Sequence, residues 1–302
     1  MNADTQALPS AALQRPRRGK RLEAGKMGLY VFLATATLFF SVPLIVILMT
    51  ALKPMDEIRA GSMFLLPAAP QLGAFAKAWS SACTGLTCEG VSVGFWNSLR
   101  IVIPSALLAV FFGAMNGYAL ALWRVRGAGL ILGALTAAIF IPYQVILYPL
   151  VKLWSAMGLF GSVPGLIAVH VIFNLPLATL IFRNFYVGVP EELVKAARVD
   201  GAGFFRIFFS VLLPLSGATV VVCLILLFTG MWNDYLFGLI FAGQGNAPMT
   251  VQLSNIVRTT AGDREYNVDM AATLLTALPP LLVYFCSGRY FVRGITAGAV
   301  KG

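Results

Sequence analysis

Residues 188–214 read GVPEELVKAARVDGAGFFRIFFSVLLP and form a polar stretch between two long apolar segments. Pro190 followed by Glu191 and Glu192 is a helix start, because proline needs no hydrogen-bond acceptor in a first turn and carboxylates favour the positive end of the helix dipole. The glycines from Gly201 onward are expected to end the helix in a left-handed turn. The sequence therefore predicts a helix of about 11 residues, roughly 16 Å long, set apart from the apolar segments.

The predicted helix has one narrow face of small apolar side chains. Leu193, Ala196 and Ala197 follow the i, i+3, i+4 spacing that places residues on one side of a helix, while the charged Lys195 and Arg198 point elsewhere. Such a face suits a shallow groove on a protein. The alternative is an amphipathic helix in the membrane interface, but those helices usually carry Trp or Phe on the apolar face.

Composition sets the broad class of the protein. Of its 302 residues 59% are hydrophobic and only 11% are charged, which is more apolar surface than a soluble domain can bury. We predict an all-α integral membrane protein with a basic tail (1–27) and a membrane domain (28–302). A span needs about 20 apolar residues. The six expected spans are 28–52, 95–123, 128–151, 163–182, 213–241 and 268–287.

The basic residues indicate an orientation. With both termini in the cytoplasm, fifteen of the 22 Lys and Arg residues lie on the cytoplasmic side and seven on the other. This bias fits the positive-inside rule and predicts a multi-pass protein of the cytoplasmic membrane with both ends inside. The net charge of +10 then needs no nucleic-acid partner, and the tail is expected to meet anionic lipid headgroups.

The outward segment between the first two spans contains Cys83 and Cys88, in CTGLTC. Thiols outside the membrane can oxidise, and the four intervening residues include a glycine that allows a small loop to close. Two interpretations stay open: a disulfide, or two unpaired thiols without a role.

Several polar groups fall within the expected spans. Ile141-Pro142-Tyr143-Gln144 interrupts the third span, and broken helices at membrane depth face either protein or a watery cavity. Asp234 is costly in lipid unless it faces the interior, water or a partner. Such groups either line a path for a polar solute or hold helices together. The candidates for a sugar path are Tyr143, Gln144, Asn174, Trp232 and Asn233.

The sequence also excludes some chemistry. His170 is the only histidine, so a histidine-based metal or catalytic cluster is ruled out. No G-x-x-x-x-G-K-[ST] loop occurs, so the chain cannot cradle the phosphates of ATP. We predict no catalytic residues, no metal site and no cofactor bound by this chain.

The stretch 188–214 resembles the coupling-loop signature of bacterial ABC importer permeases, which reads E-A-A, three residues, G, nine residues, I-x-L-P. Here Lys195-Ala196-Ala197 is followed at those spacings by Gly201 and by Val211-Leu-Leu-Pro214, with Lys195 in place of Glu and Val211 in place of Ile. The resemblance implies a cytoplasmic coupling helix that contacts an ATPase. The implied coupling residues are Glu191, Glu192, Leu193, Lys195, Ala196, Ala197, Asp200, Gly201 and Pro214.

Other segments are similar to permeases of the maltose type. Asn97-Ser98-Leu99 resembles the opening of their shared core, and the last 14 residues resemble a tail that docks on the ATPase dimer. The loop 243–269 resembles one that reaches into the solute-binding protein. CTGLTCEG, IPYQVILYP and EYNVDMAA resemble subunits assigned to glucose or mannose uptake. The implied binding-protein contacts are Arg258, Thr259, Asp263, Arg264 and Glu265.

The resemblance implies a permease subunit without its own ATPase site, in an ATP-driven sugar importer that works by alternating access. Its implied partners are a second permease subunit, an ATP-binding subunit dimer that holds ATP-Mg, and an extracytoplasmic sugar-binding protein. The alternative is a stand-alone, ion-coupled secondary transporter. That class would be favoured by several intramembrane carboxylates and an inverted repeat, and the sequence shows one borderline Asp and no convincing repeat.

Overall fold

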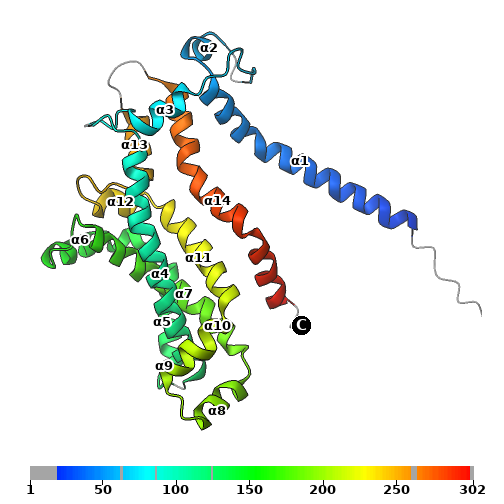
Figure 1. Cartoon of the computed structure of the whole chain (residues 1–302), viewed down its shortest axis with the longest axis vertical. Helices are drawn as coiled ribbons and strands as arrows, with labels where there is room; N and C mark the ends of the chain where they lie inside the picture. Colours follow the sequence, from blue (N-terminus) through cyan, green and yellow to red (C-terminus); the bar gives the residue numbers. More distant parts are fainter. Residues whose placement is uncertain (1–18, 62–63, 86, 124, 260–263, 300–302) are drawn as a thin grey trace, which may run out of the picture. The chain divides into compact units, whose positions relative to one another are not determined.

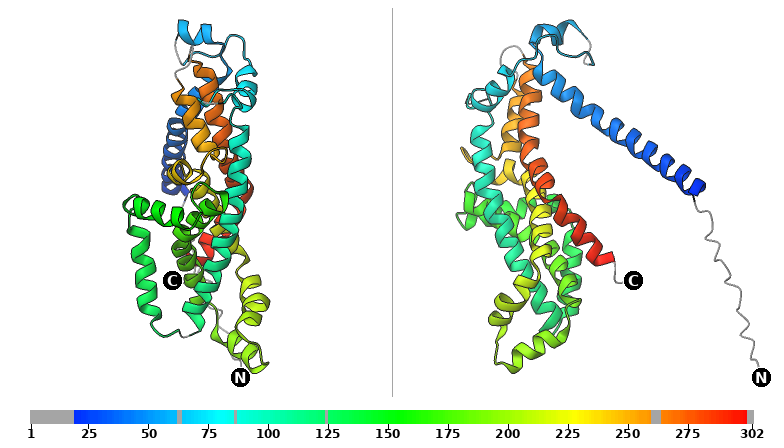
Figure 2. Two further views of the ribbon diagram at one scale, coloured as in Figure 1. Left: turned by 90° about the vertical axis from the view of Figure 1, so that its left-hand side faces the viewer. Right: turned by 45° about the vertical axis from the view of Figure 1, so that its right-hand side comes forward.

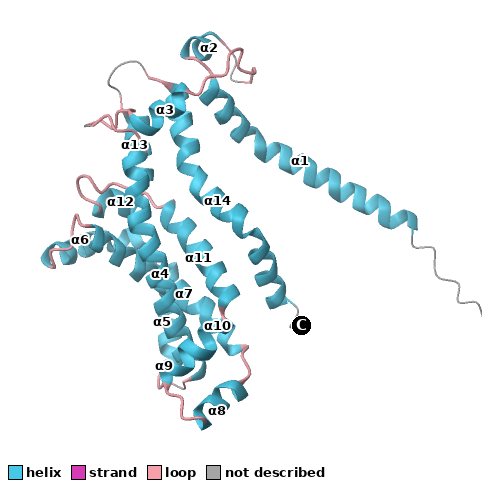
Figure 3. Cartoon of the chain, in the orientation of Figure 1, coloured by secondary structure: helices cyan, strands magenta, loops and turns pink. Residues whose placement is uncertain are grey.

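The computed structural model describes residues 19–61, 64–85, 87–123, 125–259 and 264–299, with side chains within 25–287. Two units divide the chain, residues 1–47 and residues 48–302. In the part of the chain that the structure describes, every regular element is helical (Figure 3). The predicted all-α class is thereby confirmed.

The first unit holds most of α1 (Gly19–Leu52), and the second unit holds all the other helices (Figure 1). In chain order these are α2 (Met55–Ala60), α3 (Gly73–Ser80), α4 (Ser92–Leu122), α5 (Ala128–Phe140), the 3₁₀ turn η1 (Tyr143–Ile146), α6 (Leu147–Ala156), α7 (Val163–Val187), α8 (Glu191–Val199), α9 (Phe204–Ile207), the π-helical turn η2 (Phe208–Leu212), α10 (Leu213–Leu215), α11 (Gly217–Trp232), α12 (Leu236–Phe241), α13 (Met249–Arg258) and α14 (Tyr266–Ala299).

Four of the described helices, α1, α4, α7 and α14, are long and apolar enough to cross a membrane. Two further stretches meet the same criteria only as bent pairs. One pair runs from α5 to α6 and turns by 94°, and the other runs from α9–α10 to α11 and turns by 79°. Counting each bent pair as one crossing gives six spans, the expected number.

Several expected boundaries need correction. α1 begins at Gly19, inside the expected tail 1–27, and α7 and α14 run beyond the ends of their expected spans. The expected fifth span, 213–241, is not one helix, since α11 ends at Trp232 and the chain restarts as the short α12. The Asp234 carboxylate accepts hydrogen bonds from the amides of Phe237 (3.0 Å) and Gly238 (3.2 Å). This side chain starts a new helix just after α11 ends.

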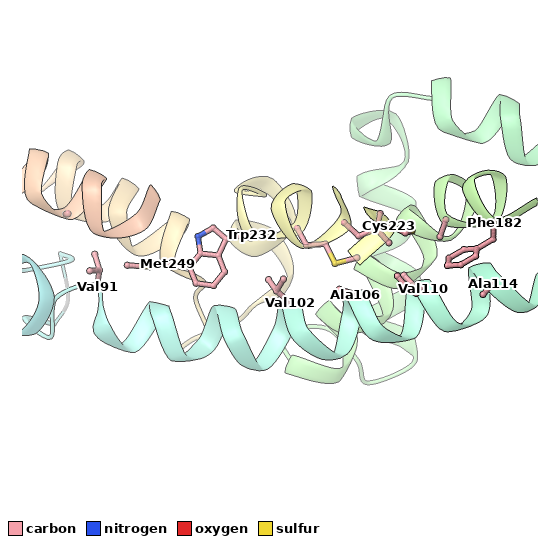
Figure 4. Packing of buried hydrophobic residues seen from close by; sticks show 14 of the residues in the cluster. Val91, Val102, Ala106, Val110, Ala114, Phe182, Cys223, Trp232 and Met249 are labelled. Atoms are coloured by element: carbon pink, nitrogen blue, oxygen red, sulfur yellow. The ribbon is translucent and has the colours of Figure 1, made fainter. Parts of the chain in front are cut away.

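The core of the second unit is built along α4, which packs against α7 over much of its length. Figure 4 shows Val102, Ala106, Val110 and Ala114 along one side of α4, where it meets α11 and α7. The two backbones lie close together at Gly117, where an added Cβ would lie 2.7 Å from the Arg183 amide nitrogen. Gly113 and Gly117 form a G-x-x-x-G pair, the pattern that lets membrane helices approach closely.

The second unit has two distinct ends. Figure 2, like Figure 1, shows α8 at one end, and α3 and α13 at the opposite end. The polar stretch 188–214 and the two segments expected outside the membrane therefore lie at opposite ends of the helices. We call them the α8 end and the α13 end.

Candidate functional site

The helix expected from Pro190 onward is present as α8 (Glu191–Val199), with Glu191 and Glu192 in its first turn. Gly201 follows it with φ of +76°, a left-handed conformation that glycine adopts without strain. The Ala202 amide donates to the Ala197 carbonyl (2.9 Å), which completes a Schellman-type end. The predicted start and end of this helix are confirmed.

The packing of α8 shows which part of its apolar surface is exposed. Val194 is buried against the core, and Ala197 is half-buried against the same core. Ala197, one turn after Leu193, therefore lies at the edge where the exposed face of α8 meets the core. The exposed apolar face consists of Leu193, Ala196 and Val199, with Val199 87% exposed.

The rotation of α8 about its axis follows from a contact that the sequence did not reveal. The Arg198 guanidinium lies 4.4 Å from the ring centre of Trp123, just after the end of α4. Arg198 also donates to the Leu122 carbonyl (3.4 Å). With Arg198 turned toward α4, Val194 faces the core and Val199 faces away. The only sequence signal for this contact was a tryptophan at the end of an apolar run.

Lys195 occupies the position where the coupling-loop signature has Glu. Its ammonium pairs with the Glu191 carboxylate one turn earlier (2.9 Å). Both side chains are more than half exposed, and such i,i+4 pairs stabilise a helix by about 0.3–0.5 kcal/mol. Glu192 and Asp200 are also exposed. The charges of α8 thus lie at its surface.

The chain passes from α8 to α11 through a bent segment. In η2 the Leu213 amide bonds to the Phe208 carbonyl, five residues back, just before Pro214. Proline cannot donate an amide hydrogen and its ring clashes with the carbonyl four residues earlier, so a wider turn accommodates it. This π-turn forms part of the pair that turns by 79°.

The predicted break of the third span is present between Phe140 and Tyr143. The Tyr143 ring packs on Phe237 of α12, with 4.6 Å between ring centres, and on Phe173 of α7 at 6.2 Å. Gln144 is exposed. The break therefore brings Tyr143 to α7 and α12.

The other candidate path residues differ in their surroundings. Trp232 is 1% exposed, and its indole N–H donates to the Thr276 carbonyl (3.0 Å), so it joins α11 to α14 as a packing residue. The Asn174 amide donates to the His170 carbonyl of its own helix (2.8 Å). Asn233 is exposed at the end of α11. For Trp232 the structure favours the helix-joining alternative.

At the α13 end, Arg258 and Thr259 close α13, while Asp263 lies outside the described residues. Arg264 pairs with Asp269 at the start of α14 (3.1 Å). Glu265 pairs with Lys77 of α3. These ion pairs tie the residues just before α14 to α14 and α3.

Cys83 and Cys88 form a disulfide in the loop between α3 and α4. The Cys83 carbonyl accepts a hydrogen bond from the Thr259 hydroxyl (3.3 Å). The cystine loop therefore contacts the end of α13, a helix that the sequence did not predict.

The family described as “Binding-protein-dependent transport system inner membrane component” matches residues 109–297. A probable ABC transporter permease protein of Pyrococcus horikoshii is 44% identical over 180 residues, 59% of this chain and 65% of that protein. An alpha-glucoside transport system permease protein of Rhizobium meliloti is 35% identical over 224 residues, 72% of this chain and 58% of that protein. The match thus spans less than two thirds of either relative.

The fold has a counterpart among solved structures. A chain in the crystal structure of a bacterial ABC transporter involved in the import of the acidic polysaccharide alginate superposes with a TM-score of 0.76. The superposition covers 90% of this chain and 98% of that one, at 18% sequence identity. This similarity extends the likeness in fold across nearly the whole chain.

Proposed function

Because the chain belongs to the family of binding-protein-dependent transport system inner membrane components, we propose that it is the permease subunit of an ATP-driven importer of a sugar. The sugar class is supported by the relative named for alpha-glucoside transport. The narrower choice of a monosaccharide such as glucose or mannose rests on the resemblance of three segments to subunits assigned to glucose or mannose uptake. These segments are CTGLTCEG, IPYQVILYP and EYNVDMAA.

The exposed face of α8 carries this proposal. Leu193, Ala196 and Val199 leave an apolar strip uncovered on a helix whose other side is packed by Val194. Exposed apolar strips of this kind mark surfaces where a partner binds. We assign this strip to an ATP-binding subunit dimer, which would hold ATP-Mg because this sequence has no phosphate-binding loop.

Three partners complete the proposed assembly: the ATP-binding dimer at the α8 end, a second permease subunit beside the spans, and an extracytoplasmic sugar-binding protein at the α13 end. In this arrangement the α8 end and both termini are cytoplasmic. Closure of the ATPase dimer moves α8, and the bent η2 segment passes that movement to α11. The spans then rock between inward-open and outward-open states, the rigid-body form of alternating access.

An ion-coupled secondary transporter receives little support. Such a carrier needs carboxylates that are available to bind and release an ion inside the membrane. Asp234 accepts two backbone hydrogen bonds at the start of α12, and Asp269 is paired with Arg264. Both acidic side chains are therefore engaged in holding helix ends.

The test is reconstitution of the chain with its ATPase, second permease and binding-protein partners, followed by measurement of ATP-dependent sugar uptake. Ala196→Trp should abolish uptake and leave this chain folded, because Ala196 is exposed in this chain and would be covered only by the ATPase. Ala196→Ser keeps the small size and serves as the matched control, with uptake near the parent level. Normal uptake by the Trp variant would remove α8 as the ATPase contact.

A further inference from the structure

Asn97 and Ser98, at the start of α4, have a role that the proposed function does not explain. Their side chains are buried, with 4% and 1% exposure. The Asn97 amide donates to two carbonyls, those of Gly245 (2.8 Å) and Ala247 (3.2 Å). The Ser98 hydroxyl accepts from the Met249 amide (2.9 Å). Two adjacent side chains thus bind a segment about 150 residues away in the sequence.

The packing around these hydrogen bonds is close. A Cβ added to Gly94 would lie 2.8 Å from the Met249 Cα, so the backbone of α13 rests directly on α4. Met249 is fully buried, and Figure 4 shows it beside Val91, next to the start of α4. A side chain at position 94 would push the two helices apart.

Asn97 and Ser98 stabilise the segment 245–249 by supplying hydrogen-bond partners for its backbone. Residues 245–248 lie between α12 and α13 without regular structure, Met249 begins α13, and the first amides of α13 have no acceptor within their own helix. Asn97 and Ser98 provide partners for two of its carbonyls and for the first amide of α13. Leaving the buried Met249 amide without a partner costs about 1–3 kcal/mol.

The segments on either side are joined to each other. The Thr250 hydroxyl of α13 donates to the Asp234 carbonyl before α12 (2.8 Å). A Cβ on Gly238 of α12 would lie 2.7 Å from Pro248 Cγ. We call α12, α13 and the segment between them the α12–α13 hairpin. Holding 245–249 therefore holds the whole hairpin.

We propose that Asn97 and Ser98 are positioning residues that bind the α12–α13 hairpin to α4, so that hairpin and helix move as one body during transport. The consequence for transport rests on the proposed function: the hairpin lies at the end assigned to the sugar-binding protein, and its position sets how that end opens. The hydrogen bonds to 245–249 are the means by which α4 moves it.

Hydrogen exchange on the reconstituted full-chain complex tests the positioning. Ser98→Ala and Asn97→Leu should speed exchange of the amides at 249–258 at least tenfold, and Ser98→Thr, which keeps the hydroxyl, should restore protection. The matched control is Ser105→Ala: Ser105 is equally buried on α4, but its hydroxyl bonds only to Ile101 of the same helix (2.6 Å). Protection equal to the parent in both Ser98→Ala and Asn97→Leu would overturn the proposal.

Transport supplies the second measurement. Ser98→Ala should lower both sugar uptake and the stimulation of ATP hydrolysis by the binding protein severalfold, with basal hydrolysis and assembly unchanged. Faster exchange with normal uptake would overturn the role in transport. Should Asn97→Leu fail to assemble, Ser98→Ala, which removes a single acceptor, decides the outcome. A parent complex that takes up no sugar would refute the proposed function, while the exchange result would still judge the positioning.

Discussion

The two ends of the second unit are held to α4 in different ways. At the α8 end, α8 is attached by the buried Val194, the half-buried Ala197 and an exposed contact between Arg198 and Trp123. At the α13 end, the α12–α13 hairpin is attached by a buried hydrogen bond from the Met249 amide to the Ser98 hydroxyl and by a part-buried one from the Asn97 amide to the Gly245 carbonyl. Exposed cation–π contacts contribute about 0.5–1 kcal/mol, whereas leaving a buried partner unpaired costs about 1–3 kcal/mol.

This difference in attachment suggests that the two ends of α4 serve different functions. α4 is a single helix from Ser92 to Leu122, about 46 Å long, with Asn97 near its start and Trp123 just after its end. A weakly attached α8 can adjust its fit to a partner, whereas a firmly attached hairpin must follow α4. Because both ends are attached to α4, the effects of substitutions at the α8 end and at the α13 end can be compared directly.

The largest effect is expected from damage to the element that both ends share. Gly117→Leu would place a side chain where a Cβ alone lies 2.8 Å from the Phe182 Cβ and 2.7 Å from the Arg183 nitrogen. We expect a loss of about 3 kcal/mol or more in the stability of the α4–α7 pair, seen as a lower melting temperature and poor assembly. Gly133→Leu on α5, where nothing lies within 4 Å, is the matched control. A tolerated Gly117→Leu would mean that α4 and α7 are not packed this closely.

Two valines of α8 sharpen the comparison within the α8 end. Val194→Asp buries an unpaired carboxylate and should destabilise the docking of α8 by about 2–3 kcal/mol in the isolated chain. Val199→Asp changes a side chain that is 87% exposed, so the isolated chain should keep its melting temperature. Association with the ATPase should nevertheless weaken severalfold in a pull-down or exchange assay. The reverse pattern would place the docking face on the Val194 side.

Removal of the Cys83–Cys88 disulfide is expected to have a smaller, local effect at the α13 end. Replacing both Cys83 and Cys88 by Ser removes a small covalent loop, which stabilises by about 2 kcal/mol in the chain-entropy account. We expect faster exchange at 82–90 and near Thr259, whose hydroxyl bonds to Cys83, while the Met249 amide stays protected. Cys286→Ser, which changes a cysteine outside the disulfide, is the control. Loss of protection at the Met249 amide would show that the cystine loop, rather than Asn97 and Ser98, holds the hairpin.

The sequence could predict what local chemistry decides. Pro190 and the two following carboxylates begin α8, Gly201 ends it, and Pro142 breaks the third span, all where the residues themselves require it. The number of apolar runs also agreed with the helices and bent pairs of the structure. These features depend on neighbours only a few residues away, and such neighbours are visible in the sequence.

Features that depend on distant contacts could not be predicted. α13 fell inside an expected loop because its apolar residues pack on α4, about 150 residues away. Which side of α8 packs on the core could not be predicted, because a nine-residue helix can rotate about its axis until a contact such as Arg198 on Trp123 fixes it. Trp232 was a candidate for the path, but its partner, the Thr276 carbonyl, lies on α14.

The smallest effect is expected from the contact that orients α8. Trp123→Leu removes the ring, and Arg198→Lys keeps the charge but loses the planar guanidinium that stacks on it. Each change should cost α8 about 0.5–1 kcal/mol, measured as faster exchange of its amides, with uptake only slightly reduced. Because one change removes this contact and the other weakens it, the double variant should cost less than the two single costs added together.

The difference between the summed single costs and the cost of the double variant shows how firmly α8 is held, compared with the α12–α13 hairpin. Full additivity would mean that Val194 alone sets the rotation of α8 and that the stacking contributes nothing. A shortfall above about 2 kcal/mol would exceed what an exposed cation–π contact supplies. In that case the α8 end would be held as firmly as the α13 end, and α8 would move with α4 as one body instead of adjusting to its partner.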